Sequence, residues 1–128
     1  MKMLIRYVAI LGWIVLLAGC TKSGQAVAPV TGRITLDGKP VEFAIVTFQA
    51  EGKSAASSST DKDGRYDLYY KRGVRGAPVG PNRVTILLDV YSAPKGLVIP
   101  PKYNSESKLH ADVQPGPNAF DFDLTTAE

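Results

Sequence analysis

Three residue types that often carry chemistry are scarce in this chain. It holds one cysteine, one histidine and one tryptophan among 128 residues. A single cysteine excludes an intrachain disulfide, and a zinc site needs several Cys or His ligands, so we expect no metal and no cofactor. Neither charge sign dominates, with 15 basic and 12 acidic residues, and no basic run is long enough to indicate a nucleic-acid partner.

The first part of the chain is typical of an export signal. Residues 1–6 carry two positive charges, 7–17 are mostly apolar, and the small residues Ala18 and Gly19 then precede Cys20. A membrane-spanning helix is the alternative, but a span needs about 20 apolar residues and polar residues end this stretch sooner. Removing 19 of the 128 residues leaves 109, enough for one hydrophobic core. The remaining 13 basic and 12 acidic residues give a net charge of +1.

The four residues at 17–20, Leu-Ala-Gly-Cys, resemble the bacterial lipobox. The resemblance implies transfer of a diacylglycerol to the Cys20 sulfur, cleavage before Cys20 and acylation of the new amine, with palmitate as the expected chain. A thiolate is the nucleophile that such alkylation needs, and two or three acyl chains anchor a protein firmly. We therefore expect 1–19 to be a lipoprotein signal peptide, with Cys20 holding the mature protein on a membrane of the bacterial envelope, on its periplasmic or outer face.

Beyond Cys20, short apolar–polar alternations are separated by turns. Residues 20–29 are mostly small or polar and predict a lipidated tether, and strand-like alternation begins at Val30. A Gly- and Pro-rich stretch at 71–81 predicts a loop. The alternation indicates seven strands, near 30–36, 44–49, 54–60, 65–70, 83–88, 109–114 and 120–124. No stretch of this part has helical periodicity, so 30–128 is predicted to be an all-β sandwich.

The same alternation predicts which side chains face the core, because successive side chains of a strand point to opposite faces of its sheet. The polar stretch at 54–60 is expected to be an edge strand. The side chains expected to point inward are Ile34, Val46, Phe48, Tyr66, Leu68, Ile86, Leu88, Val113, Phe120 and Phe122.

Four segments resemble a known family. Residues 30–48 and 60–66 are similar to carboxypeptidase regulatory-like domains. Ile-Pro-Pro-Lys-Tyr-Asn at 99–104 and Phe-Asp-Phe-Asp-Leu at 120–124 resemble small bacterial lipoproteins built on that domain. The resemblance covers nearly all of 30–124 and implies a seven-stranded transthyretin-like or immunoglobulin-like sandwich. The chain departs from the family pattern at 81–83, and the family implies no particular activity.

No set of residues predicts catalysis. His110 falls on the polar face of its strand, and the serines at 57–59 have no base beside them in the pattern. Asp61 and Asp63 before Gly64 lack the further ligands of a calcium loop, so a tight turn is the simpler interpretation. We therefore expect no enzyme activity.

The candidate interaction residues are Tyr91, Ile99 and Tyr103, which lie in a long segment at 89–108. Connections of this length are unusual in compact domains and are often functional. The alternative is that 98–101 packs along a sheet edge and blocks aggregation.

The sequence thus favours a non-catalytic envelope lipoprotein whose sandwich has a structural or interaction role. A carbohydrate- or peptide-binding module is the alternative, with exposed tyrosines such as Tyr69 available for stacking. The protein or glycan partner stays open.

Overall fold

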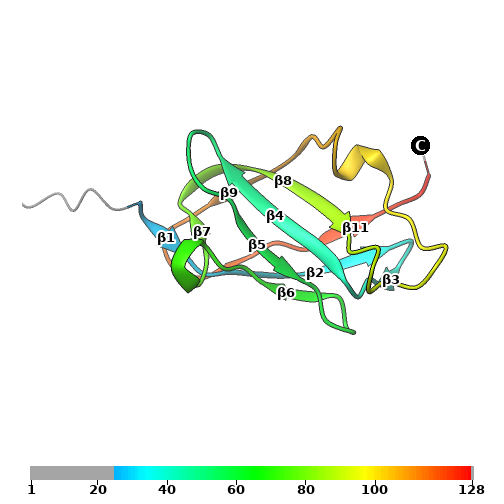
Figure 1. The fold of residues 1–128 in the computed structure, drawn as a ribbon. Helices are drawn as coiled ribbons and strands as arrows, with labels where there is room; N and C mark the ends of the chain where they lie inside the picture. The colour runs from blue at the N-terminus through cyan, green and yellow to red at the C-terminus, as the bar shows by residue number, and fades with distance from the viewer. Residues whose placement is uncertain (1–24, 128) are drawn as a thin grey trace, which may run out of the picture.

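In the computed structural model, which describes residues 25–127, short strands dominate and two 3-10 helices interrupt them (Figure 1). Within these residues no helix is long and apolar enough to cross a membrane. The elements in chain order are β1 (Val27–Ala28), β2 (Val30–Leu36), β3 (Lys39–Pro40), β4 (Ala44–Ala50), β5 (Ala56–Ser59), β6 (Arg65–Asp67), η1 (Lys71–Gly73), β7 (Ala77–Pro78), β8 (Gly80–Leu88), η2 (Pro101–Tyr103), β9 (Leu109–Val113), β10 (Asn118–Ala119) and β11 (Phe122–Leu124).

One sheet of the sandwich is antiparallel, in the order β5-β4-β8-β9. Its centre is the long pairing of β4 with β8, which places Val46 opposite Ile86 and Phe48 opposite Val84. All four side chains are fully buried, as strict alternation on a half-buried strand requires. The polar β5 lies at the edge of this sheet, which is the position predicted for it.

The other sheet is built around β2. On one side β2 pairs antiparallel with β3 and β6, and on its other side it pairs in parallel with β10 and β11. The last strands of the chain therefore lie beside the first long one, with Asn118 opposite Val30 and Phe122 opposite Ile34. The two sheets face each other and make the all-β sandwich that the alternation predicts (Figure 1).

A third, two-stranded sheet joins two segments for which no strand was expected. β1 lies within the predicted tether and pairs with β7, which lies within the predicted loop at 71–81. That loop also contains η1 and the start of β8. Ala28 and Ala77 are buried in this pairing. The small residues that predicted a tether and a loop therefore close one end of the sandwich.

The core lies between the sheets and centres on Phe48. Its ring is 5.9 Å from that of Phe120 and 6.4 Å from that of Phe122, measured between centroids. Most of the predicted inward set is buried, whereas Leu88, Phe120 and Phe122 are only partly buried and pack at the margin of the core.

Gly32 allows β10 and β11 to approach β2 closely. A Cβ atom at this position would lie 1.8 Å from the Phe120 carbonyl oxygen. The Tyr66 hydroxyl donates a hydrogen bond to that same oxygen at 2.5 Å. Burial, and to a lesser degree the charge of Asp121, raises the pKa of the Tyr66 phenol, so it stays protonated and remains a donor.

The two ends of the sandwich carry different parts of the chain. β1 lies at one end, and the last described residues, η2 and the loop before η2 lie at the other (Figure 1). At this second end the backbone N–H and the hydroxyl of Thr126 donate to the Asp37 carboxylate. These bonds lower the pKa of Asp37 from its ordinary 3.8 and fasten the last residues to the turn after β2.

Candidate functional site

A hollow of about 720 Å³ lies on the outer face of the β2 sheet. We call it the β2–β6 groove. It is lined by Thr31, Gly32 and Arg33 of β2, by Arg65, Tyr66 and Asp67 of β6, by Ser58, Ser59, Asp61 and Tyr69, and by Ala119 and Asp121.

Small side chains form the floor of the groove, so the surface is lower there than around it. Thr31 and Ala119 are directly opposite each other across the β2–β10 pairing. Both are outward-facing positions, and larger, charged side chains occupy the next outward positions, Arg33 on β2 and Asp121 after β10. A hollow therefore forms between taller neighbours, without any cavity in the core.

Two arginines stand side by side along one wall. Arg33 and Arg65 are direct cross-strand partners, and both are exposed. They form a non-hydrogen-bonded pair, since the adjacent Ile34 N–H donates to the Gly64 carbonyl, and side chains are closest in such pairs. The Asp121 carboxylate accepts a hydrogen bond from the backbone N–H of Arg33 at 2.9 Å. This bond places an anion beside the two arginines.

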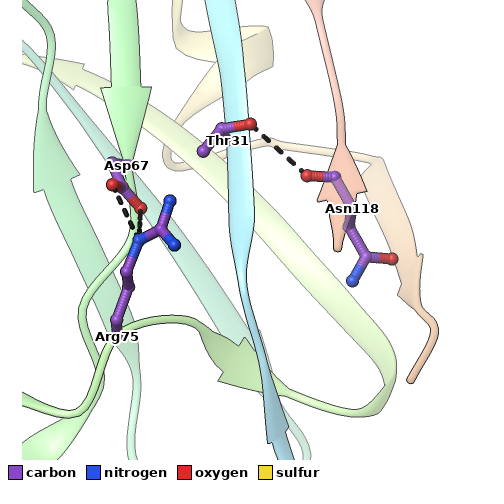
Figure 2. Close-up of polar contacts among 4 residues, drawn as sticks. All are labelled: Thr31, Asp67, Arg75 and Asn118. Carbon is purple, nitrogen blue, oxygen red and sulfur yellow. Dashed lines mark hydrogen bonds and ion pairs between the residues drawn. The ribbon is translucent and has the colours of Figure 1, made fainter. Parts of the chain in front are cut away.

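Asp67, the next outward residue of β6 after Arg65, takes part in an ion pair. The Arg75 Nε lies 2.9 and 3.0 Å from the two oxygens of Asp67, and both side chains are partly exposed. Figure 2 shows Arg75 reaching up to Asp67 at the end of β6, with Thr31 on the neighbouring strand. The Thr31 hydroxyl faces the Asn118 carbonyl oxygen at 3.5 Å (Figure 2). The Asp67 carboxylate is thus held in place, although it remains accessible from the groove.

The strands β5 and β6 separate next to Asp67. Ser57 and Tyr69 exchange two backbone hydrogen bonds, and the Asp61 N–H donates to the Arg65 carbonyl, but β5 and β6 form no ladder between these two points. They separate because β5 belongs to one sheet and β6 to the other. The opening lies at Ser59 and Asp67, both of which line the groove.

Tyr69 is the aromatic residue at the rim. Its backbone is held by Ser57 on one side and bridged to Arg75 on the other, while its side chain is 49% exposed. The sequence suggests Tyr69 as a stacking residue only in general terms. The two-residue period places Tyr69 on the same face as Arg65 and Asp67, but only the pairing of β2 with β6 brings Arg33 to this face.

The structure does not bring the three predicted interaction residues together as one surface. Tyr91 is 97% exposed in the loop after β8, whereas Ile99 is 6% exposed and belongs to the core. Tyr103 is half-buried, and its hydroxyl accepts a hydrogen bond from the Thr125 N–H at 2.9 Å. Ile99 therefore has no surface to offer a partner in this conformation, and Tyr103 serves to hold η2 against the C-terminal residues.

Part of the 89–108 segment covers the edge of β8. β9 pairs with β8 only as far as Val84, which leaves the second half of that edge unpaired. The Asn104 Nδ2 donates to the Ile86 carbonyl at 3.4 Å, and the Ser107 hydroxyl donates to the Val84 carbonyl. The residues that bond to this edge lie later in the chain than the predicted 98–101. That this cover prevents edge-to-edge association stays a prediction.

The remaining candidates lie apart from the groove or have other roles. Cys20 lies outside the described residues. His110 is exposed on β9, directly opposite Arg83 of β8, in the sheet that does not carry the groove. The Asp61 carboxylate accepts from the N–H groups of Asp63 and Arg65, which makes the predicted tight turn with Gly64 at φ 77°. Within 25–127 there is no group of three or more His, Cys, Asp or Glu side chains placed to hold a metal.

Comparison with known proteins yields few matches. No protein-family model matches the chain, and no curated protein matches it. Among solved structures it is similar to a DUF3823 family protein from Parabacteroides merdae, with 14% sequence identity and a TM-score of 0.47. That match covers 78% of this chain and 46% of the other, so the chain spans about half the length of that protein. The architecture itself defines a small β-sandwich-type domain.

Proposed function

We propose that this protein is a lipoprotein of the bacterial cell envelope, anchored through Cys20, whose sandwich domain binds a partner without catalysing a reaction. One observation carries the proposal: Leu-Ala-Gly-Cys at 17–20 follows a charged and then apolar segment, and a β-domain follows it. A cysteine thiolate at this place is the nucleophile that lipid transfer requires.

The position of β1 supports this arrangement. Only residues 21–26 separate Cys20 from β1, and even fully extended they span about 20 Å. The domain is then held close to the membrane with its β1 end facing the lipid. The C-terminus, η2 and the exposed Tyr91 loop face away from the lipid (Figure 1).

A binding role is favoured over catalysis by the content of the β2–β6 groove. Ser58 and Ser59 supply hydroxyl groups, but a nucleophilic serine needs a base beside it. The one histidine, His110, lies on β9 of the other sheet. Charged and aromatic groups without such a pair are suited to recognition.

The finer family assignment is part of the same proposal. The similarity of 30–48 and 60–66 to carboxypeptidase regulatory-like domains supports it, and so does a sandwich in which the last strands lie beside the first long one. Residues 81–83, where the sequence departs from that family, form part of β8: all three pair with β9, and Asn82 and Arg83 also pair with β4.

Mass spectrometry of the full chain, expressed in a bacterium and extracted from its membranes, tests the anchor. We expect an N-terminal peptide that begins at Cys20 and carries the mass of a diacylglycerol. Cys20→Ala should remain uncleaved and unacylated, while Thr21→Ala, the matched control, should be processed normally. An intact Gly19–Cys20 bond with an unmodified Cys20 in the wild-type protein would overturn the proposal.

A further inference from the structure

We infer that the β2–β6 groove is a binding site for a neutral saccharide. The inference rests on the proposed non-catalytic binding role and names the class of ligand. It stands on four features of the groove: balanced charge, an arginine (Arg65) whose guanidinium has no partner among the described residues, an exposed aromatic side chain on a fixed backbone, and an opening too short for a peptide strand.

The charges in and beside the groove cancel. Arg33 and Arg65 line it and Arg75 reaches into its wall, while Asp61, Asp67 and Asp121 supply the same number of carboxylates. A strongly charged ligand would meet as much repulsion as attraction. Sugar hydroxyls both donate and accept hydrogen bonds, so they suit a surface on which guanidinium donors and carboxylate acceptors alternate.

The paired arginines retain donors for a ligand. Like charges directly opposite each other on neighbouring strands are destabilising, and Arg33 and Arg65 are such a pair. Arg33 donates from Nε to the Asp63 carbonyl at 3.0 Å. Among the described residues the Arg65 guanidinium makes no hydrogen bond or ion pair, so its donors point into solvent at the groove.

Tyr69 supplies the surface on which a sugar ring can stack. Backbone bridges to Ser57 and to Arg75 fix its position, and about half of its side chain is exposed. An aromatic side chain on a fixed backbone loses little entropy when it binds a ligand. The apolar face of a pyranose can lie against the ring while its hydroxyl groups reach Asp67 and Arg65.

An extended peptide fits this place less well. A peptide that adds to a sheet needs a row of free backbone groups along an edge. Here β5 and β6 are joined at Ser57–Tyr69 and again at Asp61–Arg65, so the opening between them spans only the Ser59–Asp67 position. That length does not allow a strand to add, whereas side-chain recognition of a compact ring needs no such row.

Binding by the full, acylated chain in detergent tests the inference. The probes are tetrasaccharides of glucose, mannose and N-acetylglucosamine, a tetrasaccharide of galacturonic acid, and tetra-alanine, each measured by isothermal titration calorimetry. We expect at least one neutral tetrasaccharide to bind. Tyr69→Ala should weaken that binding about three- to tenfold, the effect of a lost aromatic contact.

Matched variants separate the site from the rest of the molecule. Tyr69→Phe keeps the ring and should bind nearly as well as the wild type, and Arg65→Gln should bind more weakly. Tyr91→Ala changes an exposed tyrosine at the end opposite β1 and should have no effect. Binding by none of the neutral probes, binding by the acidic sugar or the peptide alone, or binding unaffected by both Tyr69→Ala and Arg65→Gln would overturn the inference. Acylation of Cys20, measured on the same preparation, shows separately whether the anchor proposal holds.

Discussion

At the scale of single residues, Gly32 shows how one position determines the closeness of two strands. Its inward side is occupied by the Phe120 carbonyl oxygen and the Tyr66 hydroxyl, which bond to each other. The link between β10 and β11, which contains Phe120, is positioned in this way beside Thr31 and Arg33. The shape of the groove floor therefore depends on a residue that has no side chain.

We predict that Gly32→Ala destabilises the domain by about 1–3 kcal/mol, the usual effect of overpacking. The new methyl group would lie 1.8 Å from the Phe120 oxygen, and that atom belongs to the backbone and cannot rotate away. Chemical denaturation followed by circular dichroism measures the change. Thr31→Ala, on the outward face of the same strand, is the control and should change stability by less than about 0.5 kcal/mol. Equal effects of the two variants would show that the contact at Gly32 relaxes freely.

At the scale of elements, the 89–108 segment has two parts with different environments. Residues near Tyr91 are exposed, while η2 and the residues around it are held by Tyr103, Asn104 and Ser107. Lys102 also lies over the Tyr103 ring, with its Nζ 5.2 Å from the centroid. The second part protects an edge of β8, and only the first part is available for contact with another molecule.

Tyr103→Ser should therefore lower the free energy of unfolding by about 1–3 kcal/mol, because it removes a half-buried ring and the acceptor for the Thr125 N–H. Tyr91→Ser should leave stability within about 0.5 kcal/mol of the wild type. Thermal unfolding with light scattering reports stability and self-association together. If Tyr103→Ser neither unfolds earlier nor associates, the covering of the β8 edge does not depend on this tyrosine.

At the scale of the whole molecule, a cluster of three phenylalanine rings joins the two sheets. Phe48 of the β4 sheet contacts Phe120 and Phe122 of the β2 sheet, and its side chain is fully buried. This contact joins the two layers, and one of those layers carries the groove on its outer face. Loss of the Phe48 ring would consequently disturb the packing of the β2 sheet beneath the groove.

Phe48→Ala should cost about 3–5 kcal/mol, the range for deletion of a buried Phe. Leu87→Ala, on the exposed face of β8, should cost less than about 1 kcal/mol, because that side chain is 47% exposed. Urea denaturation monitored by circular dichroism compares the two. A small effect at Phe48 would mean that the sheets are held together mainly at other contacts.

Much of the fold follows from the sequence because strand alternation is a local property. The two-residue period identifies which side chains of β2, β4 and β8 face inward, and turn residues such as Gly64 mark where strands end. The two-residue strands β1, β3, β7 and β10 escape prediction, since so short a strand has no period to detect. The all-β class and most of the core were thus predictable.

The candidate site depends on the tertiary structure. Arg33, Arg65 and Asp121 come together only because β2 accepts β6 on one side and the segment of β10 and β11 on the other, with Arg33 and Asp121 88 positions apart in the chain. The opening at Ser59 and Asp67 arises because adjacent strands join different sheets. Periodicity reports which face a side chain occupies, but not which distant strand lies beside it. The sequence alone therefore determined the class of fold and the proposal for Cys20, and long-range strand pairing alone decided where the groove lies.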